Sequence, residues 1–175
     1  VTEGSGWKKE GSQITVEAKP KEGYVFDRWS GDIETEENPI TITIDSPKTI
    51  IANFKKQVKL EVISSYGNPN PSVGTHTYTK GVDITARVEE EVVEGDTKHK
   101  CIGWEGEGSV PNQGNTNQVT FTIEEDSKIT WKWETYHYLD IQINPEGSGV
   151  VTEGSGWKKE GSQITVEAKP KEGYV

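Results

Sequence analysis

The side chains that most often carry chemistry are scattered along this sequence and form no recognisable motif. The three histidines, His76, His99 and His137, lack the short spacing of zinc ligands. A nucleophilic serine needs a base and an orienting group beside it, and four serines lie in turn-like stretches without a nearby histidine: Ser5, Ser12, Ser30 and Ser46. No G-x-S-x-G, phosphate-binding loop or paired-carboxylate pattern occurs. We therefore predict no catalytic, cofactor-binding or metal-binding residues, and a protein that is not an enzyme.

The acidic stretch GDIETEENP at residues 31–39 is the one cluster that suggests a metal-binding hypothesis. It contains four carboxylates, at Asp32, Glu34, Glu36 and Glu37, and Ca²⁺ prefers oxygen ligands. The stretch lacks the regularly spaced Asp and Asn positions of a dedicated calcium loop. Two interpretations follow: a solvated turn, which we favour, and a calcium site.

Cys101 is the only cysteine in the chain, so a disulfide within one copy of the sequence is excluded. We favour a buried thiol, because free cysteine often occupies cores and Cys101 aligns with Phe26 in the internal duplication described below. The alternative is a crosslink between neighbouring chains.

The tryptophans suggest core positions and one interface. Trp29 and Trp104 each precede a short Gly-containing turn, and we expect both to fill a core, since a large aromatic dominates the burial energy of a small sheet. Trp131 and Trp133 share one face of a strand, which indicates a core stripe or a module contact, with a sugar-binding platform as the alternative. Trp7 lies in the turn-rich TEGSGWKKEG, so we expect it to be exposed at an interface between modules or chains.

The sequence repeats itself at two levels. Residues 1–25, VTEGSGWKKEGSQITVEAKPKEGYV, are identical to residues 151–175, at an offset of 150 residues. Within this period, ITITIDSPKTIIANF aligns without a gap with VTFTIEEDSKITWKW, GSQITVEA with GVDITARV, and RWSGD with GWEGE. The period therefore consists of two related modules. We expect residues 1–57 to form module A without its first strand, 58–137 to form module B, and 138–175 to begin the next copy of module A.

The dominant periodicity is two, with β-branched or aromatic residues alternating with polar ones, which is typical of strands with one buried face. The expected strands are residues 139–144, 150–152, 13–18, 24–29, 40–44 and 49–54 in module A, and 59–64, 76–79, 83–88, 100–104, 119–123 and 128–133 in module B. We expect 40–44 and 49–54 to form an antiparallel hairpin closed by DSPK, and EEEVVEGD at 89–96 to form a charged loop. The predicted fold class is all-β: tandem small antiparallel modules of about five to six short strands, with no substantial helix.

Composition limits the partners. The 175-residue chain has a formal net charge of −10 and a mean hydropathy of −0.75. Nucleic acids and anionic membranes attract clustered Lys and Arg, so we predict no binding to either. No apolar run approaches the roughly 20 residues of a membrane span, so we predict no membrane insertion.

Three segments, GYVFDRWSGD, NPITITID and KTIIANF, resemble the divergent internalin B-type repeat, a bacterial repeat domain. The resemblance covers nearly all of module A, and module B looks like a longer relative. It implies small β-grasp-like or related all-β units that are strung together in large secreted or cell-surface bacterial proteins. It implies no catalytic residues.

These observations predict an extracellular or cell-surface location and a structural repeat unit of a stalk or surface filament, acting as a spacer. The modules would join through short linkers at 57–59 and 134–138, with neighbouring copies as partners. A first alternative is a filament subunit that exchanges strands through the duplicated ends, since the incomplete module exposes a sheet edge. A second alternative is an adhesin module that binds carbohydrate or a host protein.

Overall fold

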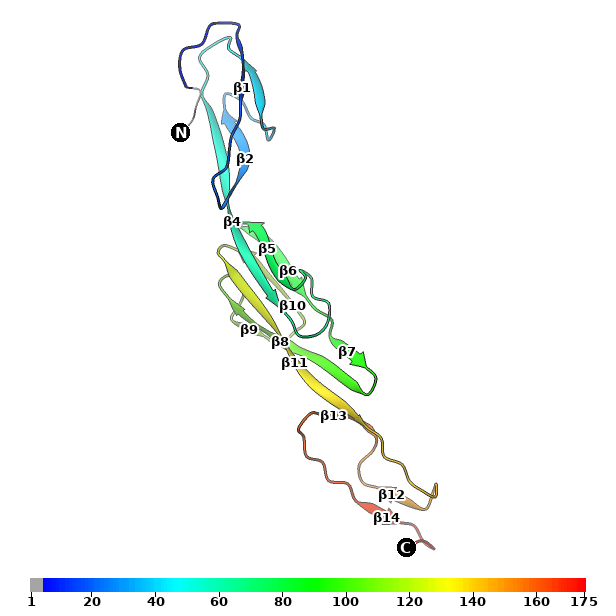
Figure 1. The fold of residues 1–175 in the computed structure, drawn as a ribbon. Coiled ribbons are helices and arrows are strands. Elements are labelled where there is room, and N and C mark those ends of the chain that lie inside the picture. Colours follow the sequence, from blue (N-terminus) through cyan, green and yellow to red (C-terminus); the bar gives the residue numbers. More distant parts are fainter. Residues whose placement is uncertain (1–4) are drawn as a thin grey trace.

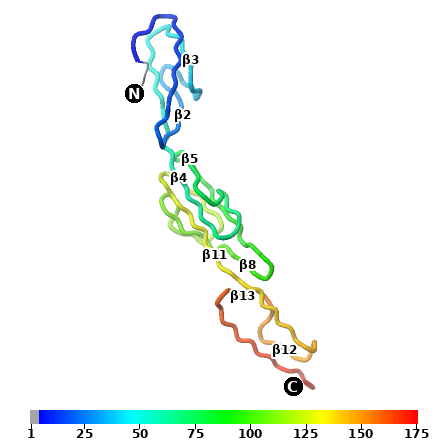
Figure 2. The backbone as a smooth tube through the Cα atoms, viewed as in Figure 1, coloured from blue at the N-terminus to red at the C-terminus, as the bar shows by residue number. Residues whose placement is uncertain are grey.

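The computed structural model describes residues 5–175, which form a rod with the two termini at opposite ends (Figures 1 and 2). Every regular element among these residues is a β-strand, which confirms the predicted all-β class. Three parts follow one another along the rod: an N-terminal segment (residues 5–56), a central module (57–133) and a C-terminal segment (134–175).

The N-terminal segment contains two strand pairs. β1 (Gln13–Val16) pairs antiparallel with β3 (Ile40–Thr43), and β2 (Tyr24–Gly31) pairs antiparallel with the first half of β4 (Ile50–Ile63). Ile40 and Ile42 point into the core while Thr41 and Thr43 are exposed, as the alternation predicts.

The central module repeats this arrangement with more strands. β6 (Val82–Arg87) pairs with β10 (Gln118–Ile123), while β8 (Thr97–Glu107) pairs with β11 (Ser127–Leu139). Three further strands extend the large sheet: β5 (Gly74–Thr79), β7 (Glu91–Glu94) and β9 (Gln113–Gly114). Side chains from both sheets meet in one core, so the module is a two-layer structure.

The duplication read from the sequence is visible in the strand pairing. Trp29 opposes Ala52, and Trp104 opposes Trp131, in corresponding strand pairs that each carry a register shift. Asn38 also binds both the amide and the carbonyl of Ala18, at 2.8 and 2.7 Å. In the central module the aligned Asn117 binds the carbonyl of its counterpart, Val88.

Two local predictions were wrong. Residues 40–44 and 49–54 do not form a hairpin, because β3 pairs with β1 in one layer while β4 pairs with β2. The DSPK segment therefore crosses from one layer to the other. The stretch 89–96 is not a loop either: β7 pairs with β8 and forms a hairpin that lengthens the large sheet.

The two long strands β4 and β11 join the parts of the rod. β4 pairs with β2 up to Lys56 and with β5 from Gln57 onwards, so one strand leaves the N-terminal segment and enters the central module. β11 does the same between the central module and β13 (Gly156–Lys159). The residues expected to be linkers, 57–59 and 134–138, are hydrogen-bonded strand residues. The prediction of linkers at these positions was therefore wrong.

The C-terminal segment holds the second copy of the identical sequence. β12 (Gly149–Val151) pairs with β14 (Ala168–Pro170), and β13 pairs with the end of β11. The strand expected at 139–144 is limited to Leu139, the last residue of β11, and 140–144 lie outside any strand. The described residues after 150 correspond to residues 1–25 and therefore contain no counterpart of β4. The strand expected at 139–144 thus has no such partner among the described residues.

Candidate interface between repeats

The structure places the three histidines in separate structural roles. His99 is buried, stacks on Tyr66 with ring centroids 3.5 Å apart, and has its Nδ1 3.1 Å from the Thr135 hydroxyl. His76 Nε2 lies 2.7 Å from the Ser72 carbonyl oxygen, and His137 Nδ1 lies 3.3 Å from the Thr97 hydroxyl. Each ring therefore supports its own strand or loop.

The acidic stretch at 31–39 is solvent-exposed at all four carboxylates. Asp32 has a structural role, because its carboxylate accepts the backbone N–H of Thr49 at 2.5 Å. Within residues 5–175, no group of three or more His, Cys, Asp or Glu side chains is arranged to hold a metal ion. The described stretch is a turn that is held by side-chain hydrogen bonds of Asp32, Thr35 and Asn38.

The core assignments of the large side chains are confirmed. Trp29, Trp104 and Trp131 are buried, and Trp133 packs against the main core from its edge. Cys101 is buried in the same core, and this burial raises the pKa of its thiol. These residues hold the two layers of their modules together.

The contacts between successive parts of the rod are the candidate functional feature. At the first junction, the amide of Gln57 donates to the Gly23 carbonyl at 2.7 Å, and the amide of Lys80 donates to the Lys56 carbonyl at 2.8 Å. Both bonds lie where β4 changes its pairing partner. The junction is therefore made of backbone hydrogen bonds.

At the second junction, a hairpin of the central module braces the next segment. Lys98, at the start of β8, lies 5.6 Å from the ring centre of Tyr136 and 5.3 Å from that of Trp157. Its Nζ also forms an ion pair with Glu91 of β7 at 3.3 Å. Tyr138 packs edge-on against Trp157. The β7–β8 hairpin thus contacts both the crossing strand and the strand that docks on it.

An ionic network strengthens the same junction. Glu134 of β11 forms an ion pair with Lys159 of β13, and it accepts a hydrogen bond from the Tyr136 hydroxyl at 3.0 Å. The bond to Lys159 lowers the pKa of Glu134, and the bond to Glu134 raises the pKa of Lys159. The Glu134 bond also raises the pKa of Tyr136. Docking is therefore favoured by the charged forms of Glu134 and Lys159 and by the neutral form of Tyr136.

The two identical segments differ in environment. Trp157 is half-buried against the central module, whereas its copy Trp7 is fully exposed, at 104% of its reference area. The prediction that Trp7 is exposed is confirmed. Its assignment to an interface stays a prediction, which the position of Trp157 now makes specific: Trp7 would pack on the β11 end of a preceding copy.

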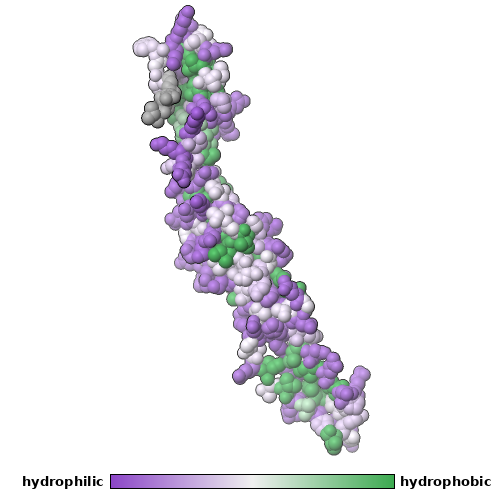
Figure 3. Space-filling model, in the orientation of Figure 1, coloured by the Kyte–Doolittle hydropathy of each residue, from purple (hydrophilic) through white to green (hydrophobic). Residues whose placement is uncertain are grey.

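The N-terminal segment contains an open groove of about 1600 Å³. Ile14, Val16, Ile42, Ile50 and Phe54 are among the apolar residues that line it. The corresponding place in the central module is filled, because residues 60–63 of β4 lie there beside 127–130 of β11. Apolar patches are visible on both end parts of the rod and also over its central part (Figure 3). The exposed apolar residues of the C-terminal segment include Ile164 and Val166.

Sequence reasoning missed the hairpin brace and the shared strands. Residues 89–96 have no counterpart in module A, and that insertion was the available signal for a feature specific to one junction. The continuous strands had a signal too, since neither 49–63 nor 127–139 contains a Gly or Pro that would interrupt the alternation.

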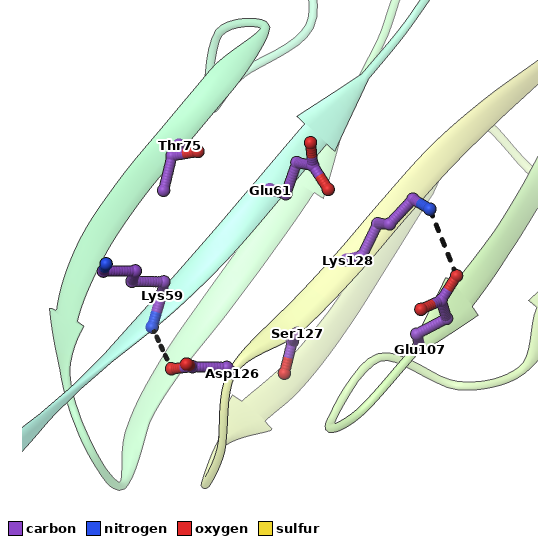
Figure 4. Close-up of a pocket in the computed structure, with 7 residues that line it drawn as sticks. All are labelled: Lys59, Glu61, Thr75, Glu107, Asp126, Ser127 and Lys128. Atoms are coloured by element: carbon purple, nitrogen blue, oxygen red, sulfur yellow. Dashed lines mark hydrogen bonds and ion pairs between the residues drawn. The ribbon is translucent and has the colours of Figure 1, made fainter.

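A shallow second pocket of about 420 Å³ lies over the centre of the large sheet and is lined mainly by charged side chains (Figure 4).

The family model described as the divergent InlB B-repeat domain matches residues 1–58 and 139–175, more than half of the chain. No curated protein and no solved structure matches the chain. Within residues 5–175, no helix is long and apolar enough to cross a membrane.

Proposed function

We propose, from the premise that the chain belongs to the divergent InlB B-repeat family, that it is a structural repeat unit of an extracellular stalk or surface filament. In this role it acts as a spacer with a period of 150 residues. The observation that carries the proposal is the passage of β4 and β11 from one part of the rod into the next as paired strands.

Continuous strands make the junctions stiff. β4 contains 14 residues, which span about 46 Å at the usual rise of about 3.3 Å per residue. Bending at Lys56 or Gln57 would break backbone hydrogen bonds on both sides of the strand. Each added period should therefore add a fixed length, which is the property that a spacer needs.

The net charge of −10 suits the same role. Parallel rods of like charge repel one another, which opposes lateral aggregation of long arrays. Direct evidence for the location would come from labelling intact cells with an antibody to the rod.

Small-angle scattering tests the spacer function. The present chain is compared with a chain lengthened by one further period of 150 residues. A rigid spacer gives a maximum dimension that grows in proportion to the number of residues. A flexible string grows roughly as the square root of its length, and that result would overturn the proposal.

A second candidate function is a filament of separate subunits that complete one another, and the open groove favours it. By analogy with the central module, residues 139–142 of another copy would lie parallel to residues 48–51, where β4 begins. A synthetic peptide of residues 138–144 should then bind the chain, and the same peptide with Ile141→Lys should not. Failure of both peptides to bind would exclude this mode.

Denaturing gels of native material separate the two candidates. A band of very high mass that is the same with and without reductant supports a covalent array. A band close to the mass of one period supports separate subunits. A high band that collapses with reductant would instead identify Cys101 as a crosslink and contradict its buried assignment.

A third hypothesis, an adhesin that binds carbohydrate or a host protein, predicts an exposed aromatic platform. Among the exposed aromatics, Trp7, Tyr24 and Phe54 line the groove of the N-terminal segment. That position favours contact with another copy of the chain over contact with sugar.

A further inference from the structure

The two strands that carry the chain through the central module lie side by side and run in the same direction. Leu60, Glu61, Val62 and Ile63 of β4 are in register with Ser127, Lys128, Ile129 and Thr130 of β11. Every other strand pair within residues 5–175 is antiparallel. The parallel pair is therefore a specific feature of the path through the rod.

This geometry decides how tension would act on the module. β4 enters from the N-terminal side and β11 leaves on the C-terminal side (Figure 1). A pull on the two ends of the rod drags β4 and β11 in opposite directions along their own axes. All of the hydrogen bonds between them are then loaded at once. If both strands were held at the same end, the bonds would break one after another.

One face of the loaded pair is shielded from water. Leu60, Val62 and Ile129 are at most 1% exposed, because the β6–β10 sheet covers that face. Sliding the strands would move these side chains out of their packed positions before any chain is released. Hydrogen bonds in such a place are also harder for water to replace during extension.

The outer face of the pair carries a further contact at the end where load enters (Figure 4). The Asp126 carboxylate accepts the backbone N–H of Lys59 at 2.8 Å, just before the parallel register begins. Lys128 forms an ion pair with Glu107 of β8 at 3.2 Å, which ties β11 to its other neighbour. These contacts cross the same strands that bear the load.

We propose that the parallel β4–β11 pair is a load-bearing clamp, and that the central module resists tension along the rod. The use of the clamp in an organism rests on the proposed stalk function. The resistance itself is a property of the chain and is testable without it.

Single-molecule pulling at two attachment geometries tests the clamp. In a Cys101→Ala background, handles at Lys56→Cys and Lys132→Cys pull the pair in shear. Handles at Lys56→Cys and Glu125→Cys pull both strands from the same end. We expect the unfolding force to be at least twofold higher in shear. Equal forces in the two geometries would overturn the proposal.

A matched pair of variants locates the resistance. Asp126→Ala removes the carboxylate that accepts a hydrogen bond from the Lys59 amide. Asp83→Ala removes a carboxylate that accepts a hydrogen bond from the Thr122 hydroxyl, in the β6–β10 sheet, which does not carry the load. Only Asp126→Ala should lower the shear force. A similar loss in both variants would mean general weakening and would contradict the clamp.

Chemical denaturation of both variants keeps this comparison interpretable. Each variant should unfold in one cooperative transition at a denaturant concentration close to that of its parent chain. If scattering shows a flexible chain but the unfolding force is much higher in shear, the stalk function is rejected and the clamp is retained. If scattering shows a rigid rod but the two pulling geometries give equal forces, the clamp is rejected and the stalk function is retained.

Discussion

Trp157 packs edge-on against Tyr138, with ring centroids 5.4 Å apart and ring planes at 77°. Tyr138 belongs to the strand that leaves the central module, and Trp157 belongs to the strand that docks on it. Trp7 has the same sequence neighbours as Trp157 and no such partner, since it is fully exposed. The pair therefore marks a contact that one copy of the identical segment makes and the other does not.

Trp157→Ala should loosen β13 from β11, and Trp7→Ala is its matched control. The lost contacts with Tyr138 and Lys98 are each worth roughly 0.5–1.5 kcal/mol, so we expect a change of about 1–2 kcal/mol. Protection of the β13 amides from hydrogen exchange should fall about tenfold. Trp7→Ala should leave it unchanged, and an equal loss in both variants would show that the junction does not depend on this pair.

Cys101 should react slowly with thiol reagents in the folded chain. Burial raises the pKa of its thiol and also blocks access, so thiolate is scarce. We expect labelling by a maleimide to be at least about a hundredfold slower in buffer than in guanidinium chloride. Fast labelling of the folded chain would reopen the hypothesis of a crosslink through this residue.

The positions of several strands followed from the sequence, but their partners did not. Alternation placed β2, β3, β6 and β10 to within about two residues, because each strand has one buried face. Alternation carries no information on which strand lies next to which. The expected hairpin between β3 and β4 failed for this reason, since the intervening turn connects two layers.

The identical segments show this limit directly. Gln13–Val16 form β1, while the same residues at 163–166 lie outside any strand. Conversely, Gly156–Lys159 form β13, while residues 6–9 are unpaired. Local propensity is the same in both copies, so the presence of β3 or of β11 decides the outcome. The repeat interface could be predicted only as far as the exposure of Trp7.

Gly103→Ala should destabilise the central module strongly. Gly103 has φ = +126°, and a Cβ there would lie 1.8 Å from the Gly114 carbonyl oxygen on β9. Both the backbone conformation and the contact must change, so we expect a loss of about 2–4 kcal/mol. Gly154→Ala is the control, because no atom lies within 4 Å of its Cβ position and its φ is not in the left-handed region.

Equilibrium denaturation measures both glycine variants. The control should stay within about 0.5 kcal/mol of the parent chain. A Gly103→Ala variant as stable as the control would show that β9 does not lie against β8 as described.

Acid should weaken the junction between the central module and the C-terminal segment. The ion pair with Lys159 lowers the pKa of Glu134 below its usual 4.5. The folded state therefore favours the ionised carboxylate, and its contribution is complete above pH 4.5. It is lost as the pH falls through the lowered pKa, because the protonated group no longer attracts Lys159. Docking of β13 should accordingly weaken as the pH is lowered from about 5 towards 3.

Glu134→Gln isolates this effect. The glutamine keeps the size of the side chain and removes the titrating charge, so hydrogen exchange at the β13 amides, corrected for intrinsic pH dependence, should show a much flatter pH profile. Glu153→Gln is a control for a second ion pair, with Lys158, that lies within the C-terminal segment. If Glu134→Gln and the parent chain lose protection in parallel as the pH falls, another group controls the junction, and the ionic network does not stabilise docking.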